Sequence, residues 1–266
     1  MSERFAERLT RRIDASGSLL CVGLDPRADR IEGDVGDFLR QVVAETTEHA
    51  AAFKPNIAYF EALGSAGFKL LEELLAEMPD EVPVVLDVKR SDIGETQKYY
   101  AKAYFENWDV DAVTLNAYLG FDTVEPFLQY EGKGVYLLGV TSNPGAADMQ
   151  LRQMEGRYAF EHVQDMAARA KGMPGDVGFV VGLTNMSGEV LSRVIDAPLL
   201  IPGLGAQGGN LDALDTAGRQ APLLVNLSRG LLFAEPEKSF SEKAEEAKRS
   251  IEAALAAKAG IPAAEK

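Results

Sequence analysis

The sequence predicts a single (β/α)8 barrel, also called a TIM barrel, and three observations lead to that prediction. Short apolar runs alternate with longer amphipathic stretches eight times along the 266 residues. Most of these runs are uninterrupted, as expected for strands that are buried on both faces of a parallel sheet. No linker divides the chain, so residues 1–266 should form one domain with a core over about residues 18–258. An open doubly wound sheet is the structural alternative.

The expected strands are the apolar runs, and the expected helices lie between them, separated by loops rich in Gly, Pro, Asn and Asp. We predict strands over residues 19–24, 52–55, 83–88, 112–115, 134–140, 178–182, 199–201 and 223–227. We predict helices over residues 37–49, 60–78, 94–107, 157–171, 188–195, 210–219 and 240–257. The predicted helix over residues 240–257 has the Ala, Glu and Lys content of a surface helix. Residues 260–266 should be a frayed tail.

Charge and composition exclude several classes of partner. The chain has 27 Lys and Arg against 41 Asp and Glu, a net charge of −14. Such a protein repels nucleic acid and anionic membranes, so we expect neither as a partner. It has no run of about 18 apolar residues and no signal-peptide core, so we expect it in the cytoplasm. Cys21, the only cysteine, lies in an apolar run, which favours a buried strand residue over a catalytic thiol.

Ionisable residues gather where the first three predicted strands end, which is where the active site of such a barrel lies. Asp25 follows the first strand, Lys54 is in the second, and Asp87, Lys89 and Asp92 belong to the end of the third. Alternate strand residues face the same way, so Asp87 and Lys89 should point together into the barrel mouth. Lys54 and Asp92 can supply the opposite charges that burial requires, giving an alternating Lys–Asp–Lys–Asp array. A structural ion-pair cluster is the alternative, but buried clusters often add little stability, which favours function.

Glycines and an arginine follow the last two predicted strands. Gly203, Gly205 and Gly208 come after the seventh strand, and Arg229 comes after the eighth. The glycines satisfy G-x-G-x-x-G, but the dinucleotide motif belongs after a first strand with an acid at the next strand end, and position 228 is Ser. Backbone N–H groups and a guanidinium in these two loops are typical of a phosphate site instead.

The two histidines do not support a catalytic or metal site. His49 and His162 fall within or beside predicted helices and away from the strand ends. A Ser–His–Asp nucleophile and a histidine metal site are therefore not supported.

At these residues the sequence closely resembles the orotidine 5′-phosphate decarboxylase family, over about residues 18–235. Residues 87–96, DVKRSDIGET, look like the family signature D-x-K-x-x-D-I-x-x-T. The loops resemble those of its longer-loop, bacterial-type branch. Five further residues match family positions on the first two strands, in the pyrimidine loop and at the phosphate: Asp25, Lys54, Ser142, Gln207 and Arg229.

The resemblance implies an activity and a mechanism. Orotidine 5′-phosphate would be the substrate and uridine 5′-phosphate the product, in de novo pyrimidine synthesis and without a cofactor. Lys89 would stabilise a carbanion at C6 of the pyrimidine and then protonate it. Asp87 would lie against the departing carboxylate, while Lys54 and Asp25 would hold the ribose hydroxyls.

The resemblance also implies further contacts with the substrate and with a second subunit. Pro202 and Ser228, at the last two strand ends, would contact the substrate near the phosphate pair. The family is a homodimer, and the residues matching those that reach into the neighbouring subunit's site are Asp92, Ile93 and Thr96.

Three other functions stay open at this stage. Sister enzymes with the same D-x-K-x-x-D signature, such as hexulose-phosphate synthase and ketogulonate-phosphate decarboxylase, use Mg²⁺ on sugar phosphates. They typically place an acid at the position of Lys54, where an ammonium would repel the metal. Lys89 or Lys54 could instead be the Schiff-base nucleophile of an aldolase. A non-catalytic phosphate sensor would need only the phosphate cradle, which leaves the charged array without a purpose.

Overall fold

The structure is a computed structural model that describes residues 3–184, 186–203 and 218–258. Eight parallel strands form one sheet in the order β2-β1-β10-β9-β8-β5-β4-β3. Parallel bridges from Phe53 to Val84 and from Asn56 to Asp87 join the two edge strands, so the sheet closes on itself. The predicted barrel is confirmed, and the open doubly wound sheet is excluded. The strands are β1 (Leu20–Leu24), β2 (Ala52–Pro55), β3 (Val85–Arg90), β4 (Ala112–Leu115), β5 (Gly134–Val140), β8 (Asp176–Val181), β9 (Leu199–Pro202) and β10 (Leu223–Leu227).

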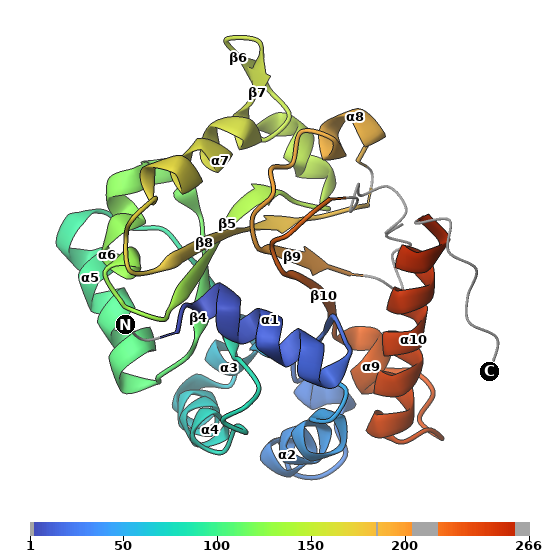
Figure 1. The fold of residues 1–266 in the computed structure, drawn as a ribbon. Helices are drawn as coiled ribbons and strands as arrows, with labels where there is room; N and C mark the ends of the chain where they lie inside the picture. The colour runs from blue at the N-terminus through green and yellow to red at the C-terminus, as the bar shows by residue number, and fades with distance from the viewer. Residues whose placement is uncertain (1–2, 185, 204–217, 259–266) are drawn as a thin grey trace.

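Helices surround the barrel, and a small hairpin projects beyond it between β5 and α7 (Figure 1). The hairpin consists of β6 (Gln153–Met154) and β7 (Arg157–Tyr158). A π-helical turn over Ala103–Asn107 directly follows the helix Gly94–Lys102. The helices are α1 (Phe5–Ser16), α2 (Val35–Thr46), α3 (Ile57–Glu61), α4 (Gly64–Ala76), α5 (Gly94–Lys102), α6 (Glu125–Leu128), α7 (Ala159–Arg169), α8 (Gly188–Leu191), α9 (Arg229–Phe233) and α10 (Phe240–Lys258). None of the helices in these described ranges is long and apolar enough to cross a membrane.

Several boundaries differ from the predicted ones. The helix expected over residues 60–78 is divided into α3 and α4, because Gly64 has φ +67° and cannot continue a helix there. The helix expected over 188–195 ends at Leu191, and the amide of Ile195 donates instead to the side chain of Gln164 on α7. Most of the helix expected over 210–219, and the whole tail over 260–266, lie outside the described residues.

Helix α1 covers the N-terminal end of the barrel, the end that faces the viewer in Figure 1. Its Phe5 and Leu9 are buried against inward-facing strand residues, including Tyr136. Gly134 makes room for them, since a Cβ at this position would lie 2.4 Å from the Phe5 ring. An apolar layer therefore fills this end of the barrel, and the polar layer above it faces the C-terminal end.

The larger apolar core lies between the outward faces of the strands and the surrounding helices. In β1, for example, Val22 and Leu24 belong to this outer core while Cys21 belongs to the barrel interior. Both faces of the barrel strands are thus buried over most of their length, which explains why these strands appear in the sequence as largely uninterrupted apolar runs.

Candidate active site

Three charged side chains meet at the C-terminal end of the barrel. The Nζ of Lys54 on β2 donates to Oδ2 of Asp87 on β3 at 3.2 Å. The Nζ of Lys89, two residues further along β3, donates to Oδ1 of the same carboxylate at 2.5 Å. The side chains of Lys54 and Asp87 are 5% and 9% exposed, whereas that of Lys89 is 48% exposed. Asp87 is therefore shared between a buried ammonium and one that reaches the open end.

The protonation of this array is set by its own charges. Burial opposes the charge of Asp87, but the attraction of Lys54 and Lys89 outweighs it and holds the pKa of Asp87 well below its usual range. Burial also opposes the charge of Lys54, but attraction to Asp87 and Asp25 outweighs it and raises the pKa of Lys54. Asp87 and Lys54 are both charged at neutral pH, so the protein holds fixed charges where a reaction could use them.

Thr114 on β4 joins the array, although it was not among the predicted site residues. Its hydroxyl donates to Oδ1 of Asp87 at 2.7 Å and accepts from the amides of Val88 and Lys89. A threonine inside the apolar strand run 112–115 was the available signal, but its partners could be recognised only from the pairing of β3 with β4.

Asp92 does not join the array of its own chain. Its Oδ1 accepts a hydrogen bond from the neighbouring amide of Ile93 at 2.8 Å, and it forms no ion pair with any described residue. Ile93 is 64% exposed, and Thr96, in the first turn of α5, is exposed as well. The array within one chain is therefore Lys–Asp–Lys, while Asp92 is half-buried and Ile93 and Thr96 are exposed.

Buried polar atoms without partners line the β1 and β10 side of the opening. Among the described residues, Oδ1 of Asp25, Oδ1 of Asn226 and Oγ of Ser228 are buried and make no hydrogen bond. The two strand ends pack tightly here, because a Cβ at Gly23 would lie 2.6 Å from Cβ of Ser228. Buried groups of this kind are rarely left unpaired in folded proteins, so their arrangement fits a polar ligand. Asp25 and Ser228 were predicted, while Asn226 was not.

The predicted phosphate site is described only in part. Arg229, the exposed first residue of α9, forms no ion pair with the residues that the structure describes, so its guanidinium is available to an anion. Pro202 ends β9 and pairs in register with Asn226. Gly203 follows with φ +80°, a backbone conformation that glycine adopts freely. Gln207, together with Gly205 and Gly208, lies outside the described residues.

Ser142 follows β5, and its backbone lies against the end of β8. A Cβ at Gly182 would be 2.4 Å from the amide nitrogen of Ser142, so only glycine fits there without displacing the loop. The preceding amide, of Thr141, donates to the side chain of Gln150 at 2.7 Å. The hydrogen bond closes the loop on itself, and the close approach at Gly182 seats its first residues on the end of β8.

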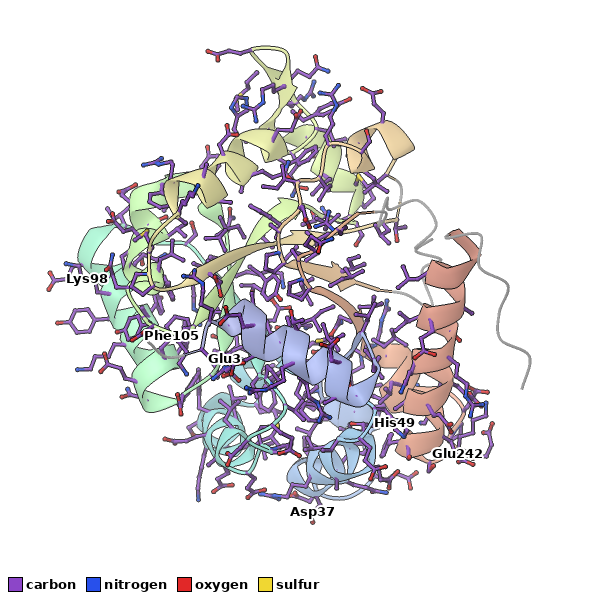
Figure 2. All side chains as sticks on the ribbon, in the orientation of Figure 1. Glu3, Asp37, His49, Lys98, Phe105 and Glu242 are labelled. Atoms are coloured by element: carbon purple, nitrogen blue, oxygen red, sulfur yellow. The ribbon has the colours of Figure 1, made fainter. Side chains whose placement is uncertain are left out.

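The two histidines take no part in the array, and the cysteine is buried in the barrel interior. His49, labelled in Figure 2, contacts α10 through Ser241 at 3.2 Å. His162 contacts the carbonyl of Met154 in the hairpin. Cys21 is fully buried, and burial raises the pKa of its thiol to about 12. No group of three or more His, Cys, Asp or Glu side chains is placed to hold a metal within the described ranges.

Known proteins with similar sequences include orotidine 5′-phosphate decarboxylases. Orotidine 5′-phosphate decarboxylase of Cupriavidus metallidurans is 41% identical over 250 residues, covering 89% of this chain and 92% of that protein. The decarboxylase of Variovorax paradoxus is also 41% identical, over 269 residues that cover 95% and 98% of the two chains.

Solved structures of related enzymes have the same fold as this chain. Leishmania donovani OMP decarboxylase matches with a TM-score of 0.82 and 36% identity, covering 95% of this chain and 98% of that one. Leishmania donovani UMP synthase matches with a TM-score of 0.84 and 37% identity, and this chain spans only 56% of its length. Residues 18–244 match the family described as orotidine 5′-phosphate decarboxylase / HUMPS. The chain therefore belongs to the orotidine 5′-phosphate decarboxylase / HUMPS family.

Proposed function

We propose that this chain converts orotidine 5′-phosphate to uridine 5′-phosphate and CO₂, in de novo pyrimidine synthesis and without a cofactor. The observation that carries the proposal is the Lys54–Asp87–Lys89 array at the end of a barrel of this family. The names of the curated relatives support the choice of substrate.

The array suits the charge that develops in this reaction. The bond between C6 and the carboxylate breaks, CO₂ leaves, and the electron pair stays on C6 in the plane of the ring. Lys89, whose side chain is half exposed at the open end, stabilises that pair and then gives C6 a proton. Asp87 lies beside the substrate carboxylate and keeps the ammonium of Lys89 directed at C6.

The remaining predicted residues hold the rest of the substrate. Asp25 and Lys54 bind the ribose hydroxyls, which would satisfy the unpaired buried oxygen of Asp25. Arg229 binds the phosphate together with Gln207, and Ser142 contacts the pyrimidine. Pro202 and Ser228 line the side of the opening between the ribose and the phosphate.

A homodimer completes the site, with Asp92, Ile93 and Thr96 reaching the partner's array. Asp92 has no cation partner among the described residues of its own chain, which leaves it available to a second copy. Apolar side chains are also unusually exposed after the adjacent strands β3 and β4, as a second copy would require. They are Ile93 at 64%, Tyr99 at 68%, Tyr118 at 75% and Leu119 at 42%.

The activity is tested by the loss of absorbance of orotidine 5′-phosphate in the presence of EDTA. The wild-type protein should convert the substrate under these conditions. Lys89→Ala should abolish this conversion and leave the protein folded. Lys69→Ala, on α4 and 76% exposed, is the matched control and should leave the rate unchanged. Near-wild-type turnover by Lys89→Ala would refute the mechanism. Activity that EDTA removes and Mg²⁺ restores would indicate sugar-phosphate chemistry, and borohydride trapping would indicate a Schiff base.

The shared site is tested with mixed dimers of Lys89→Ala and Asp92→Ala subunits. Each homodimer carries two damaged sites, but a mixed dimer concentrates both defects in one site and leaves the other intact. After unfolding and refolding together, about half of the dimers are mixed, so roughly a quarter of wild-type activity should return. If verified mixed dimers are no more active than the two parents, Asp92 serves its own chain.

A further inference from the structure

Thr114 has an unusual place in the array. It lies on β4 and is 1% exposed. Its Oγ1 makes three hydrogen bonds: to Oδ1 of Asp87 at 2.7 Å, from the amide of Val88 at 3.0 Å and from the amide of Lys89 at 2.9 Å. One buried hydroxyl therefore connects the carboxylate and the backbone that carries the ammonium.

The chemistry of a hydroxyl group fixes the direction of these bonds. A hydroxyl has one hydrogen to donate and two lone pairs to accept with. The amides of Val88 and Lys89 can only donate, so they occupy both lone pairs. The single hydrogen of Thr114 must then point at Oδ1 of Asp87, which favours the carboxylate form of Asp87 over the acid.

The backbone of β3 needs this support. Leu86 pairs in register with Val113, and Arg90 pairs with Leu115, so residues 87–89 face the single residue Thr114. At this bulge Lys89 has φ +43°, a region that residues with side chains adopt rarely and keep only where their surroundings hold them. The Thr114 hydroxyl bonds two successive amides where the regular ladder is interrupted.

We propose that Thr114 is a positioning residue, whose hydroxyl sets the relative placement of Asp87 and Lys89 for the reaction. The proposal rests on the roles given to these two residues above. Thr114 acts through them and does not touch the substrate. Its loss should therefore slow the chemical step and leave substrate binding almost unchanged.

The test compares kcat and KM for Thr114→Ser and Thr114→Ala, which lack the same methyl group and differ only in the hydroxyl. Thr114→Ser should stay within about threefold of the wild-type kcat. Thr114→Ala should lose about 30- to 100-fold in kcat, because a misplacement of about 1 Å at a reacting group can cost about 10²-fold. KM should change less than about threefold in both variants. Thr114→Val, which keeps the shape, should behave like Thr114→Ala. Rates are measured at 15 °C, so that a lower melting temperature does not limit them.

Thr46 on α2 provides the matched control. It is 0% exposed, and its hydroxyl donates to the carbonyl of Val42 at 2.7 Å, far from the reaction in the sequence and the fold. Thr46→Ser and Thr46→Ala should keep the wild-type kcat, whatever their melting temperatures.

Equal kcat for Thr114→Ser and Thr114→Ala would overturn the inference, as would a rise in KM with kcat unchanged. The proposed mechanism fails separately, if Lys89→Ala turns over like the wild type. An inactive Lys89→Ala beside a fully active Thr114→Ala would refute the role of Thr114 alone.

Discussion

Replacing Asp87 with Asn removes the negative charge of the array and keeps its shape. Lys54, whose side chain is 5% exposed, then loses its closest counter-ion and faces a neutral amide. Breaking a buried ion pair by removing one partner costs about 3–5 kcal/mol. Lys54 keeps the attraction of Asp25, so we expect the lower end of that range, about 3 kcal/mol at pH 7.

The loss of stability should depend on pH in a defined way. The pKa of Asp87 is lowered by folding, so its contribution is present above about pH 4 and disappears as the pH falls through the folded value. The pKa of Lys54 is raised by folding, so its contribution is present below about pH 10.5 and disappears as the pH rises through the folded value. The difference between wild type and Asp87→Asn should therefore be largest from about pH 5 to about pH 9 and shrink on both sides.

Urea denaturation at one protein concentration, from pH 3 to pH 11, measures this difference without an activity assay. Asp37→Asn is the control, since that side chain is 81% exposed beside Arg40 on α2 (Figure 2). It should change the free energy of unfolding by less than about 1 kcal/mol. The reasoning is refuted if Asp87→Asn is within about 1 kcal/mol of the wild type at pH 7, or if its deficit keeps growing toward pH 3.

Two further substitutions test the substrate contacts. Arg229→Ala should raise KM and lower kcat/KM by about 1.5–3 kcal/mol, as expected for the loss of a charge-assisted phosphate contact. It should barely affect the turnover of orotidine, which lacks the phosphate. An equal loss with both substrates would place Arg229 elsewhere. Gly182→Ala should displace the Ser142 backbone, since the added Cβ would lie 2.4 Å from its amide nitrogen, and lower kcat/KM by about tenfold or more. Gly188→Ala, whose Cβ would meet nothing within 4 Å, should have no such effect, and equal rates for both glycine variants would contradict the steric argument.

The barrel and the centre of its array could be predicted from the sequence. Strands buried on both faces appear as uninterrupted apolar runs, and the eightfold alternation leaves few topologies. Lys54, Asp87 and Lys89 were identified because strand ends converge in a barrel and alternate residues share a face. Each of these rules depends only on the order of residues along the chain.

Other features depend on neighbours that are distant in the sequence, and only the tertiary structure decided them. Thr114 meets Asp87 because β4 lies beside β3 and a bulge sets three residues against one. The side-chain oxygen of Asn226 is buried without a partner because β10 packs against β1, which the sequence does not reveal. Asp92, although close to Lys89 in the sequence, makes no ion pair with it, because the chain turns away before α5. Sequence periodicity determines which face of a strand a residue occupies, whereas the packing of strands and the course of loops determine what that residue meets.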